Sequence, residues 1–280
     1  MVDTSRLERL LRPRDRAGTR RTALALPVRP GASAPLRRVP DRADIAAAWD
    51  DLCAAQPAKA PPRGATTSTL ARDPAVERAF DMLRAQLLQA ARADGWRSLA
   101  VTAPDRGCGA SFVTTALAHS LGRLASTQTV VLDLDLEAPS LADAFELEAP
   151  GPISAMLDAS VPPGEHLRRH AGTLALGLST PCDRGAAALF QNGGFAETLS
   201  EVTLDYAPEL VLCDLPPLLS SDAAVAALAN IDAVLIVADG TRTQPADMRA
   251  CEALLPERCR FLGAVLNRGQ DARFKRFTGR

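Results

Sequence analysis

The chain has 280 residues, 47% of them hydrophobic and 23% charged, which is the composition of an ordinary globular protein. Its 32 basic and 33 acidic residues nearly cancel, so no global attraction to nucleic acid is expected. The apolar runs are too short to span a bilayer, and the first residues lack the apolar segment of a secretory signal. The six cysteines have neither CxxC pairs nor metal-ligand spacing, so reduced thiols in a cytoplasmic protein are expected.

Residues 1–74 are rich in arginine, proline and alanine and are expected to form a flexible extension. Proline interrupts every helical pattern in this part except over 41–55, where Ile45, Trp49 and Leu52 share one face of a short helix. Two interpretations stay open for this helix. It belongs to a flexible tail and forms transiently, or it docks against a partner or against its own domain.

Regular alternation of helices and strands begins at residue 75. An amphipathic helix is expected over 75–93, followed by helices over 111–125, 195–202, 222–230 and 245–255. Short apolar strands alternate with them, over 98–103, 129–134, 174–178, 209–214, 233–238 and 261–266. Near-continuous apolar strands separated by helices are typical of parallel sheets covered on both faces. The sequence therefore predicts an α/β domain over 75–270, a doubly wound and mostly parallel sheet with helices on both faces, and a basic tail over 271–280.

The loop after the first predicted strand has the features of a phosphate-binding loop. Gly107 and Gly109 allow the backbone to approach a phosphate, and Ser111 stands at the start of the following helix, where a P-loop places its Mg²⁺-binding hydroxyl. The standard pattern fails at two positions, because Pro104 replaces its first glycine and Ala110 replaces its lysine.

Carboxylates end two other predicted strands. Asp133 and Asp135 close the strand over 129–134, and Asp214 closes the strand over 209–214. Since ligands of such sheets bind at the carboxyl ends of the strands, these residues and Ser111 are expected to form an oxygen-rich Mg²⁺ site. Taken singly, each aspartate could instead cap the helix that follows it.

The ordered series VTAPDRGCGAS, VVLDLDLEAPSL, LVLCDLPPLLSSDA, DAVLIVADGTRT and FLGAVLNR resembles the bacterial tyrosine kinases of capsule and exopolysaccharide loci. These kinases belong to the wider Min/Par group of P-loop ATPases, and the resemblance covers about two-thirds of the chain. It implies that ATP or ADP binds with Mg²⁺, with the phosphates on the loop residues Arg106, Gly107, Cys108, Gly109, Ala110 and Ser111.

The resemblance also implies roles for single residues. Asp133 and Asp135 would be the catalytic carboxylates, one of them aligned with the family's proposed base. The metal would be held by Ser111, Asp133 and Asp214, and Asn267 would contact adenine. The implied partner is a membrane-spanning polysaccharide chain-length protein, a copolymerase, which would hold the chain at the inner face of the plasma membrane, with a homo-oligomer as a further possibility.

Two departures from the family affect the chemistry. Ala110 supplies no charge where the family's lysine compensates the β- and γ-phosphates, a contribution of several kcal/mol. Glu137 adds a negative charge where the family often has arginine. Arg106 could reach the phosphates from within the loop, but a solvated side chain is the favoured expectation.

Two further departures affect assembly and phosphorylation. The charged helix motif linked to ring assembly appears here as Arg78, Asp81 and Arg84, so the oligomer contact is expected to be altered or absent. The family ends in a tyrosine cluster, whereas this chain ends in RFKRFTGR and has Tyr206 as its one tyrosine, ahead of a core strand.

Three functions follow from these observations. The first is a regulatory, pseudokinase-like component of an exopolysaccharide complex that binds Mg·nucleotide weakly or not at all. The second is an active ATPase or tyrosine kinase in which Arg106 or a partner's basic residue replaces the lysine. The third is a scaffold that needs no nucleotide.

Overall fold

The computed structural model describes residues 40–59, 73–182 and 185–269. Its strands are β1 (Ser98–Thr102), β2 (Thr129–Asp133), β3 (Arg168–His170), β4 (Leu174–Gly177), β5 (Leu210–Asp214), β6 (Ala233–Asp239) and β7 (Arg260–Asn267). They form a seven-stranded sheet in the order β3-β4-β2-β5-β1-β6-β7, in which only the pairing of β3 with β4 is antiparallel. The doubly wound, mostly parallel α/β fold expected from the sequence is confirmed.

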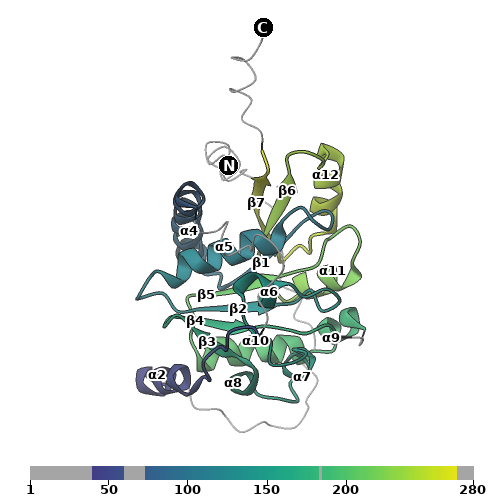
Figure 1. Cartoon of the computed structure of the whole chain (residues 1–280). Helices are drawn as coiled ribbons and strands as arrows, with labels where there is room; N and C mark the ends of the chain where they lie inside the picture. Colours follow the sequence, from purple (N-terminus) through teal and green to yellow (C-terminus); the bar gives the residue numbers. More distant parts are fainter. Residues whose placement is uncertain (1–39, 60–72, 183–184, 270–280) are drawn as a thin grey trace.

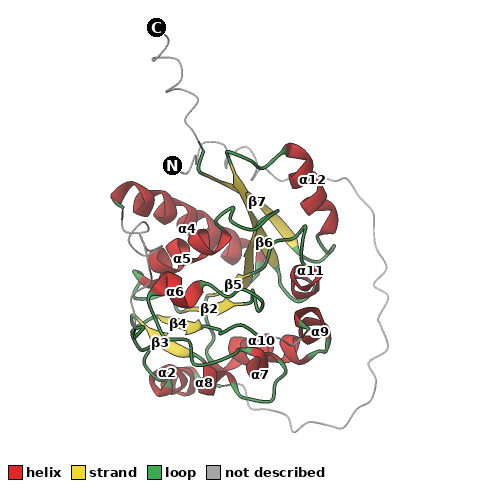
Figure 2. Cartoon of the chain, turned by 45° about the vertical axis from the view of Figure 1, so that its right-hand side comes forward, coloured by secondary structure: helices red, strands yellow, loops and turns green. Residues whose placement is uncertain are grey.

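Helices cover both faces of this sheet (Figures 1 and 2). One face carries α4 (Pro74–Asp94), α5 (Ala110–Gly122) and α6 (Leu141–Phe145). The other face carries α2 (Arg42–Asp51), α7 (Ser154–Leu157), α8 (Pro163–His166), α9 (Ala186–Gln191), α10 (Gly194–Asp205), α11 (Asp222–Leu228) and α12 (Pro245–Leu254). None of the helices within the described ranges is long and apolar enough to cross a membrane.

The central strands are apolar throughout because they supply two hydrophobic cores at once. In β1, Leu99 and Val101 point to the core beneath α4 and α5, while Ala100 between them points to the opposite core. All three side chains are completely buried. Alternation of side chains across a pleated strand thus produces continuous apolar runs in the sequence.

The parallel strands bring their carboxyl ends to one edge of the sheet. The loop that follows β1 leads there into α5, and β2 and β5 end side by side with Asp133 opposite Asp214 in the register. This edge therefore gathers the loop and the carboxylates that the sequence analysis singled out.

Some elements were not anticipated from the sequence. Strand β3 consists of Arg168, Arg169 and His170, all half-buried, and such a polar triplet has no apolar signal of a strand. The helices α6 to α9 have between four and six residues each, too few to show a helical repeat. Short polar or irregular segments lie outside what periodicity can detect.

Helix α2 docks against its own domain, which was one of the two interpretations open for it. Asp41 caps its first turn, and Trp49 is 3% exposed. The indole Nε1 of Trp49 donates to the carbonyl oxygen of Tyr206 at 2.7 Å, and the two rings meet edge to face at 6.0 Å. The chain then continues beside β3, where Arg169 exchanges backbone hydrogen bonds with Cys53 and Ala55. The rest of the expected extension, residues 1–39 and 60–72, and the tail 270–280 lie outside the described residues.

Replacing Trp49 with alanine is expected to destabilise the domain by about 3–5 kcal/mol, because a buried indole and its hydrogen bond are lost together. Urea denaturation followed by circular dichroism measures this free energy. The control is Met82→Ala, since Met82 is 52% exposed and should change the stability little. Equal midpoints for the Trp49→Ala variant and the wild type would show that α2 contributes nothing to the fold.

Candidate nucleotide and magnesium site

The loop between β1 and α5 depends on two glycines in the left-handed region. Gly107 has φ of +78° and Gly109 has φ of +101°, which other residues rarely adopt. A Cβ atom on Gly109 would overlap Nδ2 of Asn267, so a side chain at this position would force Asn267 to move. None of the backbone N–H groups from Gly107 to Gly109 donates a hydrogen bond of normal geometry to a described residue. Such N–H groups beside a helix start can bind an anion.

Asp133 and Asp214 lie opposite each other at the ends of β2 and β5, and both are buried. One oxygen of Asp214 accepts from the Thr114 hydroxyl of α5 at 2.7 Å. One oxygen of Asp133 accepts from the backbone N–H of Leu141 at 2.9 Å and of Ser140 at 3.1 Å. The other oxygen of each carboxylate has no partner among the described residues.

Burial perturbs both carboxylates. It raises the pKa of Asp214 to about 7, an effect that the nearby hydroxyl groups of Ser111 and Thr114 oppose. Burial also raises the pKa of Asp133 well above its usual range, and the charge of Asp214 adds to the effect. Ser111, Asp133 and Asp214 are thus brought together at the start of α5, although they are far apart in the sequence.

The residues at this edge fit a magnesium ion. Two unpartnered carboxylate oxygens and the hydroxyl of Ser111 form a hard oxygen donor set, and Mg²⁺ is usually held by one or two carboxylates, waters and substrate phosphates. Within the described ranges there is no group of three or more histidine, cysteine or acidic side chains placed to hold a metal by themselves. A metal here would therefore need phosphate and water to complete its coordination.

The pH dependence of stability should reveal the buried carboxylate of Asp214. Its folded pKa, about 7, exceeds the ordinary value of 3.8, so between these values the folded chain holds a proton that the unfolded chain releases. Stability without Mg²⁺ should therefore fall as the pH rises through this window. We expect Asp214→Asn, which can still accept from Thr114, to melt several degrees above the wild type near pH 8 and to lose most of that advantage as the pH falls toward 4. Thermal melts give the comparison, and parallel pH profiles would contradict it.

Asp135 is engaged by an arginine. Arg106 Nη1 lies 2.7 Å from one oxygen of Asp135, and Arg106 Nη2 lies 3.8 Å from Glu137. The expectation that Arg106 is simply solvated is therefore wrong: its side chain is half-exposed but pairs with Asp135, one of the two carboxylates singled out in the sequence. The negative charge of Glu137, noted in the sequence as a departure, helps to hold this arginine.

The position of the missing lysine is not filled by a lysine from elsewhere in the described chain. Ala110 is the first residue of α5 and its side chain is half-buried against the core. The sequence has two lysines, Lys59 and Lys275. Lys59 pairs with Glu148 at 3.0 Å, and Lys275 lies outside the described residues.

Asn267 lies against the loop. Its Nδ2 donates to the carbonyl oxygen of Cys108 at 2.8 Å, and its Oδ1 accepts from the backbone N–H of Arg268 at 3.0 Å. Contact of Asn267 with adenine, implied by the resemblance, stays a prediction.

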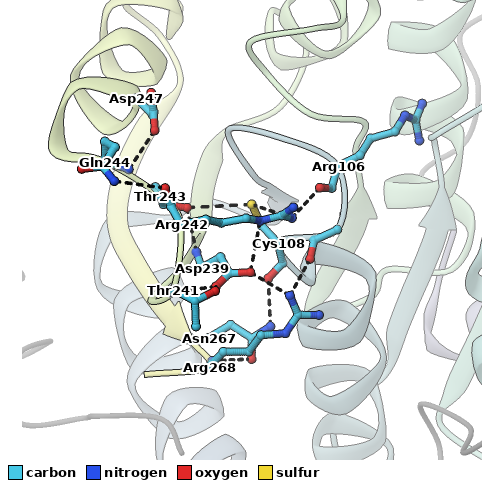
Figure 3. Close-up of polar contacts among 11 residues, drawn as sticks. Arg106, Cys108, Asp239, Thr241, Arg242, Thr243, Gln244, Asp247, Asn267 and Arg268 are labelled. Carbon is cyan, nitrogen blue, oxygen red and sulfur yellow. Dashed lines mark hydrogen bonds and ion pairs between the residues drawn. The ribbon is translucent and has the colours of Figure 1, made fainter. Parts of the chain in front are cut away.

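The polar residues that lie beside Asn267 were not expected from the sequence. Asp239, Arg242 and Arg268 join it in one polar cluster beneath the loop, and Figure 3 shows the Arg106 side chain directed away from this cluster. Asp239 ends β6 as Asp133 and Asp214 end their strands, so the rule that selected those two could also have selected Asp239.

Asp81 of the helix motif linked to ring assembly, and the one tyrosine, Tyr206, both make contacts within the chain. Asp81 accepts from Arg84 at 2.9 Å, from the Ser120 hydroxyl at 2.6 Å and from Arg123 at 2.5 Å, which joins α4 to α5. Tyr206 is 6% exposed beneath Trp49. A phenol buried in this way cannot reach another active site without local unfolding.

No protein-family model matches the chain, and no curated protein matches its sequence. Solved structures do match the P-loop-type α/β fold described above. The chimeric protein CapA2B2 superposes with a TM-score of 0.64 at 19% identity, covering 82% of this chain and 100% of that one. The kinase domain of the Escherichia coli tyrosine kinase ETK gives 0.63 at 18% identity, covering 76% and 84%. The BceF tyrosine kinase domain gives 0.63 at 19% identity, covering 81% and 97%.

These matches define the class of the fold. The chain has the P-loop-type fold of bacterial tyrosine kinase domains, as the sequence motifs indicated. At such low identity the likeness establishes the fold alone, so the chemistry of the site has to be argued from the residues of this chain.

Proposed function

We propose that the chain is a regulatory, bacterial-tyrosine-kinase-like component of an exopolysaccharide assembly complex, which binds Mg·nucleotide weakly and does not transfer phosphoryl groups efficiently. The observation that carries the proposal is that the groups able to hold a metal are present, while the lysine that would compensate the phosphate charge is absent. The buried carboxylates Asp133 and Asp214 keep unpartnered oxygens near Ser111, while Ala110 stands where the charge-compensating lysine belongs.

Each part has a defined role in this proposal. Bound Mg²⁺ would offset the charge of the phosphates. Ser111 and Asp133 would hold the metal, with Asp214 acting through water, and the N–H groups from Gly107 to Gly109 would bind phosphate oxygens. Ala110 would leave the charge that develops during transfer uncompensated, which slows that step by several orders of magnitude.

Asp135 supports the absence of efficient catalysis. As a base it would have to accept a proton, but its carboxylate is paired with Arg106 at 2.7 Å. The pair also engages the one loop cation that could replace the lysine, so it disfavours an active kinase that relies on Arg106.

The partner in this proposal is a membrane-spanning polysaccharide copolymerase, which would bring the chain to the inner face of the plasma membrane. Two of the three charges of the ring-assembly motif, Asp81 and Arg84, are paired within one chain, whereas Arg78 is exposed, so a contact with a neighbouring copy would differ from the family's. Regulation would therefore act through the state of the nucleotide site and its effect on the partner, rather than through tyrosine phosphorylation.

The test combines the purified chain with the cytoplasmic segment of a membrane-spanning polysaccharide copolymerase from the same organism. We expect binding of Mg·ATP, association with that segment, and neither phosphotyrosine nor hydrolysis above background. Robust autophosphorylation would defeat the proposal. Partner-stimulated hydrolysis that disappears in both Arg106→Ala and Asp133→Asn would favour the active enzyme. Unchanged partner binding and polysaccharide output in Asp133→Ala and Asp214→Ala would favour the scaffold.

A further inference from the structure

Three successive carbonyl oxygens of the phosphate loop accept hydrogen bonds from side chains on and beside β6 and β7 (Figure 3). The bonds run from Arg242 Nη2 to Arg106 O at 2.5 Å, from Arg268 Nη1 to Gly107 O at 3.0 Å, and from Asn267 Nδ2 to Cys108 O at 2.8 Å. Two of the three donors are guanidinium groups, so these bonds are charge-assisted and strong.

Asp239 fixes both guanidinium groups. Its Oδ2 lies 2.7 Å from Arg268 Nη1 and 3.2 Å from Arg242 Nε, and the carboxylate is fully buried. Its Oδ1 accepts from the hydroxyl of Thr241 at 2.6 Å and from the N–H of Thr241 at 2.9 Å. These bonds from Thr241, with help from Arg268, lower the pKa of Asp239 to about 2. We call Asp239, Arg242, Asn267 and Arg268 the Asp239 clamp.

The clamp determines where the N–H groups of the loop point. In a trans peptide the N–H lies opposite the carbonyl of the same plane. Because the carbonyls of Arg106, Gly107 and Cys108 face the clamp, the N–H group of the residue that follows each of them faces the other side of the loop. No described residue accepts from these N–H groups. A cation bonded to the carbonyl end of a peptide also polarises its N–H, which strengthens that N–H as a donor.

An independent observation points to a ligand on that side. Asp214 is 1% exposed, and its Oδ2 has no partner among the described residues. Its other oxygen accepts from the hydroxyl of Thr114, the fifth residue of α5. A buried carboxylate oxygen without a partner at that place would be stabilised by a bound cation. Beside the N–H groups of the loop, such a cation could also coordinate the oxygens of a bound phosphate.

We propose that the Asp239 clamp orients the loop so that Gly107, Cys108 and Gly109 bind the α- and β-phosphates of a Mg·nucleoside diphosphate through their N–H groups. This inference rests on the proposed function and names the ligand class and the positioning residues. Backbone N–H groups of a P-loop serve the α- and β-phosphates, whereas its lysine serves the β- and γ-phosphates. With Ala110 in place of that lysine, the γ-phosphate gains no additional partner, and ADP is bound as well as ATP.

Calorimetric titration of the full chain with Mg·ADP and Mg·ATP tests the clamp. We expect wild-type dissociation constants for the two nucleotides within about threefold of each other, and a weakening of both by about tenfold or more in the double variant Arg242→Gln, Arg268→Gln. Arg268→Lys, which keeps a cation beside Asp239, should recover part of the affinity. The matched control is Arg92→Gln, which removes an ion pair with Glu209 and should leave both affinities unchanged.

The outcomes separate this inference from the proposed function. A folded double variant, as judged by circular dichroism, that binds both nucleotides as tightly as the wild type overturns the clamp and leaves the proposed function standing. A wild-type chain that binds ATP at least tenfold more tightly than ADP overturns the assignment to a diphosphate. A wild-type chain that binds neither nucleotide overturns the proposed function and this inference together.

Discussion

Replacing Ala110 with lysine is expected to raise the affinity of the chain for Mg·ATP by at least about tenfold and to create a preference for ATP over ADP. The new ammonium group would extend from the first turn of α5 toward the phosphates that the loop N–H groups are proposed to bind. A lysine in this position compensates charge on the β- and γ-phosphates, in a site where an electrostatic contact is worth several kcal/mol. Titration with both nucleotides, together with an assay of ATP hydrolysis, measures the change.

The matched control for this prediction is Ala110→Gln, because glutamine also adds a long polar side chain but carries no charge. We expect the glutamine variant to bind ATP and ADP as the wild type does. If the lysine and glutamine variants behaved alike, the phosphates would not lie within reach of position 110, and the proposed site would be misplaced.

Replacing Gly109 with alanine is expected to abolish nucleotide binding and to lower stability by more than the cost of backbone strain alone. The backbone of Gly109 has φ of +101°, and strain of this kind costs about 1–3 kcal/mol for other residues. In addition, the new methyl group would overlap Nδ2 of Asn267, so Asn267 would have to give up its hydrogen bond to Cys108. Urea denaturation and calorimetric titration measure the two effects.

Gly193 provides a matched control, since its φ is +80° and a Cβ atom added there would meet no atom of the described residues within 4 Å, its chain neighbours apart. Gly193→Ala should therefore lose stability through strain alone and keep its affinity for nucleotide. Equal losses of stability in the two variants, with binding retained in both, would contradict the close contact between the loop and Asn267.

Much of the fold and part of the site could be predicted because their signals are local. Apolar runs such as DAVLIVA mark buried parallel strands, and such strands bring their carboxyl ends to one edge. Ser111, Asp133 and Asp214 could be selected on that ground, and the register of β2 with β5 places the two aspartates side by side. Strand β3 was missed because it pairs with β4 through backbone hydrogen bonds. Its residues, Arg168, Arg169 and His170, are polar and show no apolar strand pattern in the sequence.

The side-chain partners could not be predicted, because they depend on packing between distant segments. Arg106 and Asp135 are 29 residues apart, and nothing in the sequence distinguishes their pairing from solvation. Asn267 reaches Cys108 across 159 residues, and Arg268 reaches Gly107 across 161. The docking of Trp49 on Tyr206 spans 157 residues and was open between two interpretations for the same reason.

We propose that the loop N–H groups, Ser111, Asp133 and Asp214 form one site for a metal-bound nucleotide. A crystal structure of the chain with ADP and Mn²⁺, whose anomalous signal locates the metal, tests it most directly. We expect the metal to be bound by Ser111 at the ends of β2 and β5, with the diphosphate on the N–H groups of Gly107 to Gly109. Metal and diphosphate bound elsewhere on the chain, or absent at saturating concentrations, would contradict it.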